Sequence, residues 1–465
     1  MRFPMIFDTI CALSTAPGTA AIAVVRLSGT LAFPVARRIF RPADKEKEID
    51  TVPSHTVHLG IIGKGDAILD EVLMTIFRAP HSYTGEDVIE ISCHGSVYIQ
   101  QKIIELLLEN GLRMAEPGEF TLRAFMNGKF DLSQAEAVAD LIASRSGSAH
   151  GLAIQQVRGG FSKKIKELRK QLVDFTSLIE LELDFSEEQM EFADRKELMG
   201  LLIRIRTELG ALIESFRLGN VIKNGIPVAI IGKPNVGKST LLNAILNEEK
   251  AIVSEIPGTT RDAIEDTIVI GGYSFRFIDT AGLRAAEDAV ETIGIEKTWE
   301  KIHDASIILY VFDVTGQSFE EVITAIDEFK ELTTDKSKHL VLIGNKTDKL
   351  QELPKGFRNF VEFETIFVSG KRLENIHLIA AHLQKLVQEA DISDRTIISN
   401  SRHYEALQNA LDAIIAVEES LHTNLSPDLM TIDIHKALYH LGNITGEITT
   451  DEILGNIFSK FCIGK

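Results

Sequence analysis

One stretch of this chain constrains its fold more than any other. The apolar sequence PVAII at 227–231 is followed by GKPNVGKST at 232–240 and by the apolar run TLLNAIL at 240–246. Residues 232–239 match the pattern G-x-x-x-x-G-K-[ST] between a strand and a helix, which is the setting that a phosphate-binding loop requires. The alternative is a chance glycine-rich turn, and the motifs further along the chain have to decide between the two.

Each residue type in this loop suits the phosphates of a nucleotide. Gly232 and Gly237 let the backbone fold closely round the phosphates, so that its N–H groups point at them. Lys238 supplies positive charge for the β- and γ-phosphates, which makes it a catalytic candidate, and the Ser239 hydroxyl is placed to bind Mg²⁺. The residues expected to contact the nucleotide here are Asn235, Val236, Gly237, Lys238, Ser239 and Thr240.

Two later motifs belong near the γ-phosphate and the magnesium ion. DTAG ends a predicted strand, so Asp279 can reach Mg²⁺ through a water and the Gly282 N–H can sense the γ-phosphate. GTTRD lies between DTAG and the phosphate loop, where a first switch segment falls. A threonine hydroxyl there completes the Mg²⁺ shell and orders the segment while γ-phosphate is bound. On the residues alone, either Thr259 or Thr260 fits that role.

Two further motifs point to guanine as the base. NKTD ends the predicted strand HLVLIG, and its Asp348 carboxylate can accept hydrogen bonds from the guanine N1–H and amine. Adenine offers neither in that arrangement, and a site built to pair buried polar groups discriminates by orders of magnitude. Asn345 and Lys346 brace the loop and cover the base. SGK, with Ser369 and Gly370, stands where another base-contacting loop belongs. The phosphate loop, DTAG, NKTD and SGK, in this order along the chain, predict a G domain that binds GTP.

The catalytic group of this G domain is not evident from the motifs alone. Leu283 directly follows DTAG, where Ras-like proteins carry the glutamine that orients the attacking water. Leucine cannot hold a water, so the polar group must come from elsewhere. The following segment offers four carboxylates, any of which could also be a solvated residue on a helix face: Glu287, Asp288, Glu291 and Glu296.

Length and composition limit the rest of the chain. A chain of 465 residues exceeds the ~250–300 at which one hydrophobic core stops growing, so we expect two or three domains. No apolar run approaches the ~18 residues of a membrane span, and the N-terminus is a poor signal peptide, which favours the cytoplasm. Three cysteines far apart suggest neither a disulfide framework nor a zinc site. The net charge of −18 argues that any RNA-binding surface is a local patch or belongs to a partner protein.

The sequence pattern changes three times along the chain. Short apolar strands and one helix come first, then helical spacing in which LSQAEAVADLIASRS begins with a Ser133…Glu136 capping-box pattern. Strand, loop and helix then alternate as in a doubly wound parallel sheet, and helical spacing finally returns. We therefore predict a multidomain protein: an N-terminal α/β domain at 1–118, an all-α helical domain in two halves at 119–219 and 381–465, and an inserted α/β P-loop G domain at 220–380.

With these motifs in view, the chain resembles the MnmE (TrmE) family of tRNA modification GTPases, in the wider TrmE-Era-Der group. The phosphate loop, GTTRD, DTAGLR and NKTD fit the wider group. Text outside those motifs narrows the resemblance to MnmE and extends it over essentially the whole chain: SYTGEDVIEISCHG at 82–95, EPGEFTLRAFMNGKFDLSQAEAVADLI at 116–142, VETIGIEKTW at 290–299 and FCIGK at 461–465.

The resemblance implies a specific activity. It implies an N-terminal domain that homodimerises and binds 5-formyl- or methylene-tetrahydrofolate, followed by a helical domain interrupted by the G domain. With the FAD-containing partner MnmG, in a heterotetramer or larger complex, such a protein adds an aminomethyl or carboxymethylaminomethyl group to C5 of the tRNA wobble uridine. GTP hydrolysis is expected to need pairing of two G domains, promoted by K⁺.

The resemblance also assigns roles to residues of the G domain. It places K⁺ on Asn235, Ser254, the Ile256 carbonyl and Thr259, which leaves Thr260 for Mg²⁺ beside Ser239. The cation then supplies positive charge where an arginine finger would otherwise act. Matching of VETIG selects Glu291 from the four carboxylates as the residue that orients water.

In the N-terminal domain and at the chain end, the resemblance assigns folate contacts to Arg26, Glu90, Lys129 and Lys465. Without it, Arg26 and Lys129 would be interpreted as ordinary surface cations. Cys462 is expected to be needed for tRNA modification, although a small buried hydrophobic residue is the alternative interpretation of that cysteine.

A regulatory GTPase switch in ribosome or RNA biology is the competing function. A protein of the Era type carries a C-terminal RNA-binding KH domain with a GXXG loop. This sequence has helical spacing and FCIGK in that region instead, which favours the tRNA-modifying enzyme.

Overall fold

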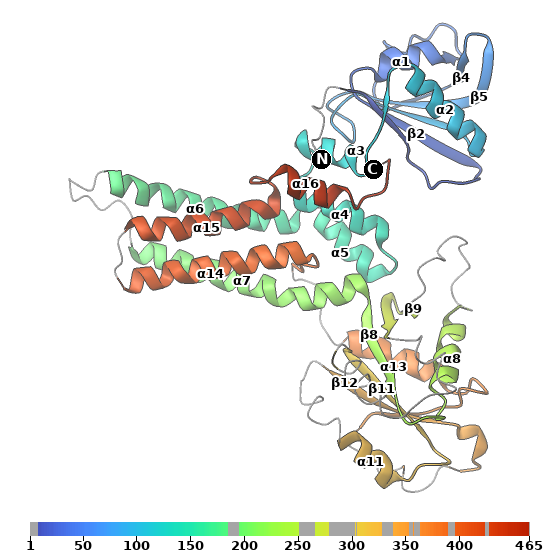
Figure 1. Cartoon of the computed structure of the whole chain (residues 1–465), viewed down its shortest axis with the longest axis vertical. Helices are drawn as coiled ribbons and strands as arrows, with labels where there is room; N and C mark the ends of the chain where they lie inside the picture. Colours follow the sequence, from blue (N-terminus) through green and yellow to red (C-terminus); the bar gives the residue numbers. More distant parts are fainter. Residues whose placement is uncertain are drawn as a thin grey trace. The chain divides into compact units, whose positions relative to one another are not determined.

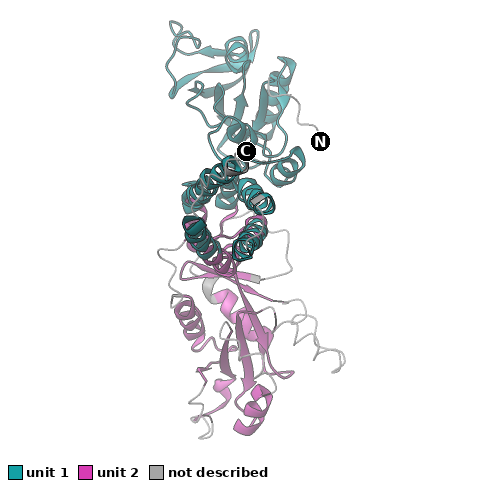
Figure 2. Cartoon of the chain, turned by 90° about the vertical axis from the view of Figure 1, so that its left-hand side faces the viewer, with its two compact units in different colours: residues 1–142, 155–209, 405–465 teal, residues 143–154, 210–404 magenta. Residues whose placement is uncertain are grey.

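The computed structural model describes most of the chain, and its residues fall into two compact units. The described residues are 8–184, 195–250, 266–278, 303, 305–327, 338–352, 357, 363–388, 396–423 and 427–464. The first unit comprises 1–142, 155–209 and 405–465, and the second comprises 143–154 and 210–404 (Figure 2). The second unit is therefore an insertion in the sequence of the first. The division into three domains at the predicted boundaries stays a prediction, because these two units group residues 1–118 with much of the helical part.

The first unit begins with a seven-stranded sheet (Figure 1). The strands are β1 (Ile10–Leu13), β2 (Ile22–Ser28), β3 (Phe40–Pro42), β4 (Thr56–Lys64), β5 (Ala67–Phe77), β6 (Val88–His94) and β7 (Arg113–Met114), in the order β3-β4-β5-β6-β2-β1-β7. All neighbours are antiparallel except β1 and β7. Alternate strand residues such as Val25, Met74 and Ile91 join α1 (Ala32–Ile39) and α2 (Val97–Glu109) in one core. The residues between them, Arg26 and Glu90 included, therefore point to the other face of the sheet.

The helices of the first unit follow the sheet and return at the far end of the chain. They are α3 (Glu119–Met126), α4 (Leu132–Ala143), α5 (Gly147–Val157), α6 (Gly160–Asp184), α7 (Arg195–Asn224), α14 (Ser401–His422), α15 (Pro427–Thr445) and α16 (Asp451–Phe458), although α4, α5, α7 and α14 extend into the second unit. Helix α15 runs along α6, and α16 packs on α3 (Figure 1). An ion pair of 2.6 Å from Arg206 Nη1 to Glu418 Oε2 joins α7 to α14. Among the described residues, no helix combines the length and apolarity that crossing a membrane would require.

The predicted capping box of α4 is wrong by two residues. Ser133 lies inside the helix, and the reciprocal pair is Asp131 and Gln134. Asp131 Oδ1 accepts from Gln134 N at 3.1 Å, and Gln134 Oε1 accepts from Asp131 N at 3.1 Å. Aspartate and glutamine satisfy the N–H groups of the N-cap and N3 positions, as serine and glutamate do in the usual capping box, so the motif is shifted by two residues but keeps its chemistry.

The second unit holds a doubly wound sheet, as the alternating pattern predicts. Its strands are β8 (Ile226–Ile231), β9 (Asp266–Ile270), β10 (Tyr273–Phe277), β11 (Ile307–Asp313), β12 (His339–Asn345) and β13 (Thr365–Phe367), in the order β13-β12-β11-β8-β10-β9. Only the β9–β10 pair is antiparallel. Helices α8 (Lys238–Lys250) and α13 (Ile376–Gln388) contribute to one core, and α11 (Phe319–Asp327) contributes to the core on the other face. β8, β11 and β12 are buried on both sides and therefore read as continuous apolar runs.

Candidate functional site

The predicted nucleotide residues gather where the parallel strands of the second unit end. β8 leads into the phosphate loop, β12 ends at Asn345, and Ser369 follows β13 closely. The carboxyl ends of parallel strands meet at one edge of a sheet, which is where open α/β sheets bind their ligands. The topology therefore brings the phosphate loop to the same edge as NKTD and SGK, which lie more than a hundred residues further along the chain.

Both glycines of the phosphate loop have backbone conformations that favour glycine, and both lie in close packing. Gly232 has φ +146°, and a Cβ there would lie 2.1 Å from the Val311 carbonyl oxygen. Gly237 has φ +97°, and a Cβ there would lie 2.4 Å from Asn345 Nδ2. Lys238 Nζ donates to the carbonyl oxygens of Gly232 and Lys233, both at 2.9 Å, so its ammonium lies within the loop. Helix α8 starts at Lys238, which turns the N–H groups of its first turn, including those of Ser239 and Thr240, toward this edge.

Asn345 is the residue that joins the three loops. It is 3% exposed, and its Nδ2 donates to the Val236 carbonyl oxygen at 2.9 Å. Its Oδ1 accepts from Lys346 N at 2.8 Å and from Gly370 N at 3.0 Å. Through these contacts the one neutral amide group of Asn345 holds the phosphate loop, NKTD and SGK together, which is how it can brace the loop as expected. The Gly370 N–H is engaged with Asn345 here, so its contact with the guanine oxygen stays a prediction.

Asp348 has the properties that an acceptor for guanine needs. Ser369 Oγ donates to Asp348 Oδ1 at 2.7 Å, and this hydrogen bond lowers the pKa of the Asp348 carboxyl. The group is therefore ionised at neutral pH and presents carboxylate lone pairs to N–H donors. Adenine lacks those paired donors, so the described loop fits guanine.

Asp313 is a member of this site that the motifs did not reveal. Lys346 Nζ donates to Asp313 Oδ2 at 2.7 Å and to the Asn235 carbonyl oxygen at 2.5 Å. Burial raises the pKa of Asp313, but hydrogen bonds from Lys346 and Thr315 outweigh it and the pKa falls below its ordinary value. Asn235 and Lys346 have φ +63° and +70°, so the hydrogen bond from Lys346 Nζ to the Asn235 carbonyl oxygen links two residues in left-handed backbone conformations. Asp313 lies at the end of β11, between β8 and β12, and this position at the carboxyl edge of the sheet is the feature that could have predicted its place in the site.

Several predicted residues lie outside the described part of the chain. These are Ser254, Ile256, Thr259, Thr260, Asp279, Gly282, Glu291 and Lys465. For Mg²⁺ the described candidate is Ser239 in the first turn of α8, and for K⁺ it is Asn235. Both present oxygen atoms, which suit hard cations.

A second group of predicted residues lies on the sheet of the first unit. Arg26 on β2 stands directly opposite Glu90 on β6 in the strand register. Arg26 Nε and Nη2 both lie 2.8 Å from Glu90 Oε1, and the two side chains are 20% and 25% exposed. Lys129 is exposed, and its Nζ donates to the Pro80 carbonyl oxygen at 3.0 Å. Arg26 is therefore not an ordinary surface cation, because it is half-buried and paired with another predicted folate residue.

The end of the chain is held against the first strand of the same sheet. Ser14 Oγ donates to the Gly464 carbonyl oxygen at 3.2 Å, and a Cβ at Gly464, whose φ is +94°, would lie 2.3 Å from Leu13 O. Gly118 N donates to the Cys462 carbonyl oxygen at 3.4 Å. Leu13 pairs with Val25, the neighbour of Arg26, so the residue before Lys465 lies close to the Arg26–Glu90 pair in the strand register.

Cys462 is exposed, and the alternative interpretation of it as a small buried hydrophobic residue is wrong. The other two cysteines are buried, and burial raises the pKa of Cys11 and of Cys93 to about 11. Their thiols are protonated at neutral pH and poorly nucleophilic. Of the three, Cys462 is therefore the one whose thiol other molecules can reach.

Fold and site together define a class, the P-loop proteins selective for guanine nucleotides, and here the nucleotide-binding unit is inserted into a larger chain. Comparison with known proteins gives the family. The family model described as MnmE helical domain matches residues 132–462, and the one described as GTP-binding protein TrmE N-terminus matches 9–129.

Full-length relatives agree with the family models. The tRNA modification GTPase MnmE of Flavobacterium psychrophilum is 54% identical over 98% of this chain and 99% of the relative. That of Flavobacterium johnsoniae is 53% identical with the same coverage, and that of Cytophaga hutchinsonii is 52% identical over 98% of both chains. The chain therefore belongs to the MnmE family of tRNA modification GTPases. It is an enzyme, a GTPase that acts in tRNA modification, and this activity implies binding of GTP with Mg²⁺.

Proposed function

We propose that this chain is a K⁺-stimulated GTPase which, with the FAD-containing protein MnmG, adds an aminomethyl or carboxymethylaminomethyl group to C5 of the tRNA wobble uridine. The observation that carries the proposal is similarity to MnmE proteins along the whole chain, at 54% identity to one of them. The described geometry adds that the guanine-selecting carboxylate and the phosphate loop share one edge of a sheet, fastened by Asn345.

The phosphate loop supplies the electrostatics of GTP hydrolysis. Lys238 gives positive charge to the β- and γ-phosphates, and the backbone N–H groups of the loop and of α8 add fixed donors. Ser239 and Thr260 are the proposed protein ligands of Mg²⁺, and Asp279 and the Gly282 N–H are proposed to contact its water and the γ-phosphate. Such preorganised charge stabilises the transition state without reorganisation during the reaction.

We propose Asn235, Ser254, the Ile256 carbonyl and Thr259 as the K⁺ ligands. Asn235 supports this because it is exposed at the loop and its left-handed turn is fixed by the hydrogen bond from Lys346. K⁺ bound there would place positive charge beside the phosphates. Replacing K⁺ by Na⁺ at constant ionic strength should slow GTP hydrolysis by at least about tenfold. Equal rates in the two salts would remove Asn235 from this role.

Glu291 is the proposed residue that orients the attacking water. The Glu291→Ala variant should keep near-normal GTP affinity while its kcat falls by about a hundredfold. Glu287→Ala is the matched control, since that carboxylate belongs to the same segment and should be dispensable. If the control loses kcat and Glu291→Ala does not, the catalytic group is reassigned.

The Arg26–Glu90 pair, with Lys129 and Lys465, forms the proposed site for 5-formyl- or methylene-tetrahydrofolate. The donor set fits: a carboxylate suits the N–H donors of a pterin ring, and lysines suit the carboxylates of a glutamate tail. The geometry supports this fit because Glu90 is fixed by Arg26 and is still partly exposed. The folate would supply a one-carbon unit or hold the two N-terminal domains together.

The open face of the N-terminal sheet supports homodimerisation. Helices α1 and α2 pack on one face only, and the other carries exposed apolar residues, among them Val57 and Leu59 on β4 and Leu73 on β5, which stands opposite Leu59. Scattered apolar residues are ordinary, but neighbouring ones on adjacent strands mark an interaction surface. We propose that a second copy of the chain covers this face.

The net charge of −18 supports a division of labour in which MnmG carries most of the tRNA-binding surface, within a heterotetramer or larger assembly in the cytoplasm. Nucleoside mass spectrometry of tRNA from a deletion strain tests the activity. The wobble-uridine modification should disappear and return with the wild-type gene. Normal modification in the deletion strain, with cofractionation of the protein and ribosomal subunits, would favour the regulatory GTPase instead.

A further inference from the structure

The loop between β5 and β6, residues 79–87, is built to hold one shape. Ala79 N donates to Asp87 Oδ1 at 2.9 Å across the base of the loop, and Ser82 Oγ donates to the Glu86 carbonyl oxygen at 2.5 Å. These two bonds close the segment on itself. The mechanism proposed so far uses only its Pro80 carbonyl, as the acceptor of Lys129.

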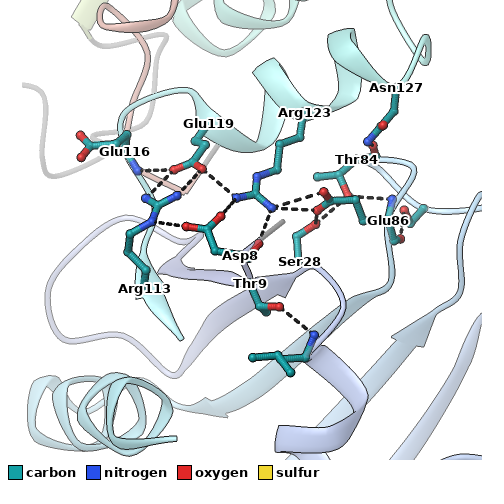
Figure 3. A network of polar contacts seen from close by, with 12 residues as sticks. Asp8, Thr9, Ser28, Thr84, Glu86, Arg113, Glu116, Glu119, Arg123 and Asn127 are labelled. Carbon is teal, nitrogen blue, oxygen red and sulfur yellow. Dashed lines mark hydrogen bonds and ion pairs between the residues drawn. The ribbon is translucent and has the colours of Figure 1, made fainter. Parts of the chain in front are cut away.

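A polar network also fastens this loop from outside. Ser28 Oγ donates to Glu86 Oε2 at 2.6 Å, and Arg123 Nη1 donates to the same oxygen at 3.2 Å (Figure 3). Asn127 Nδ2 donates to the Thr84 carbonyl oxygen at 2.8 Å. Arg123 is 1% exposed and is itself held by the carboxylates of Asp8 and of Glu119, one turn earlier on α3. Helix α3 thus holds the loop through a buried charged network, in which the loss of one partner would leave an uncompensated buried charge.

The loop places the ring of Tyr83 against the Arg26 guanidinium. The Arg26 guanidinium carbon lies 5.3 Å from the centre of that ring and 5.6 Å from the centre of the buried Phe120 ring. The Tyr83 hydroxyl shares a hydrogen bond of 2.8 Å with Thr121 Oγ1, and its ring contacts Phe130 with centroids 5.8 Å apart. Burial raises the pKa of Tyr83, so the phenol stays neutral at physiological pH.

Arginine next to aromatic rings gains both attraction and a defined orientation. The ring face is electron-rich and attracts the guanidinium, and a planar cation packed on rings loses the rotational freedom that it has in water. Arg26 in turn holds Glu90 through its Nε and Nη2 atoms. The polar network therefore holds the loop, and the loop places the Tyr83 ring. The ring orients Arg26, which in turn holds the Glu90 carboxylate.

We propose that Tyr83 is a positioning residue of the folate site: its ring fixes the Arg26 guanidinium, and through it the Glu90 carboxylate, for recognition of a reduced pterin. This inference rests on the proposed folate binding. It adds a specificity-determining aromatic residue that lies outside the predicted ligand set, and it gives the buried charged network that holds this partly buried loop a role in the site.

Calorimetric titration of the full-length protein with 5-formyltetrahydrofolate tests the inference. Tyr83→Phe keeps the ring and should bind within about threefold of wild type, because only the hydroxyl bond to Thr121 is lost. Tyr83→Leu and Tyr83→Ala remove the ring and should weaken binding by about thirtyfold. Tyr98→Ala is the control, since Tyr98 is 63% exposed on α2. GTP hydrolysis should be unchanged in all four variants.

The outcomes separate the two claims. If wild type and the Tyr98→Ala control bind no folate, the proposed folate function fails. If both bind, and Tyr83→Leu binds as tightly as wild type, the positioning role of Tyr83 is overturned while the folate function stands. Near-normal folate binding by Tyr83→Phe together with weakened binding by Tyr83→Leu, which is apolar but has no ring, supports a role for the aromatic ring.

Discussion

The nucleotide edge of the second unit and the Arg26–Glu90 region of the first are constructed in opposite ways. At the nucleotide edge, three contiguous stretches meet, their main contacts involve backbone groups, and the buried centre is the neutral amide of Asn345. In the Arg26–Glu90 region, single side chains from β2, β6, a loop and α3 meet, and the buried centre is the charged Arg123. The first kind of site can be recognised from sequence motifs, whereas the residues of the second come together only when the chain folds.

The comparison also predicts different sensitivities. A site made of backbone groups depends on the exact course of the chain and should fail when a side chain is added. A site made of charged side chains should fail when a charge is removed or protonated, because the partners left behind are buried and unpaired.

Adding one methyl group to the phosphate loop should have the largest effect. In Gly237→Ala the new Cβ would lie 2.4 Å from Asn345 Nδ2 on a backbone of φ +97°, so the loop must shift. We expect GDP affinity to fall by about a hundredfold or more, measured by titration of a fluorescent GDP analogue. Gly316→Ala is the control, since its nearest neighbour is Asp313 Oδ2 at 3.7 Å. Unchanged GDP affinity in Gly237→Ala would show that nucleotide binding does not depend on the exact course of the backbone in the phosphate loop.

Removing one charge from the network should mainly affect stability. In Glu119→Gln, Arg113 and Arg123 each lose an ion pair (Figure 3). We expect the free energy of unfolding of the first unit, measured by urea denaturation at pH 7, to fall by about 3 kcal/mol. Glu109→Gln, which removes an exposed pair with Lys64, is the control and should leave the midpoint in place. GDP affinity should stay normal in both variants.

The same network predicts the direction of the pH dependence. Burial raises the pKa values of Asp8 and Glu119, but hydrogen bonds and charges from Arg113 and Arg123 outweigh it, so both pKa values lie below the ordinary 3.8 and 4.5. The folded state therefore binds protons less readily than the unfolded state, and the stabilisation is present above those values and lost as the pH falls below them. The difference between wild type and Glu119→Gln should shrink on acidification from pH 7 to pH 3.5, and a constant difference would contradict the assignment.

The smallest effects should come from the bridge between two nucleotide loops. Asp313→Asn weakens the contact with Lys346 and should lower GDP affinity by about tenfold. Thr315→Ala removes only a hydroxyl that donates to Asp313 Oδ1 at 2.7 Å, and about threefold is expected. Equal effects of the two variants would mean that the charge of Asp313 is not what positions Lys346.

The contrast between the regions also explains what the sequence could predict. Lys238, Asn345 and Asp348 were identified because each sits in a short motif whose spacing fixes its place at a strand end. Asp313 was missed because one aspartate after an apolar strand is common, and only strand order places it beside Lys346. Tyr83 could not be predicted as a site residue from SYTGEDVIEISCHG, because nothing in that sequence shows that a loop tyrosine faces an arginine on β2. The α4 capping box was shifted by two residues because aspartate and glutamine serve as well as serine and glutamate.

We propose that this one chain carries two independent sites, one for guanine nucleotide and one for reduced folate. Calorimetry with GDP and with 5-formyltetrahydrofolate on wild type, Asp348→Ala and Glu90→Gln tests it most directly. Wild type should bind both ligands. Asp348→Ala should lose GDP binding by about a hundredfold and keep folate, and Glu90→Gln should do the reverse. Folate binding that falls with Asp348→Ala, or survives unchanged in Glu90→Gln, would contradict the account.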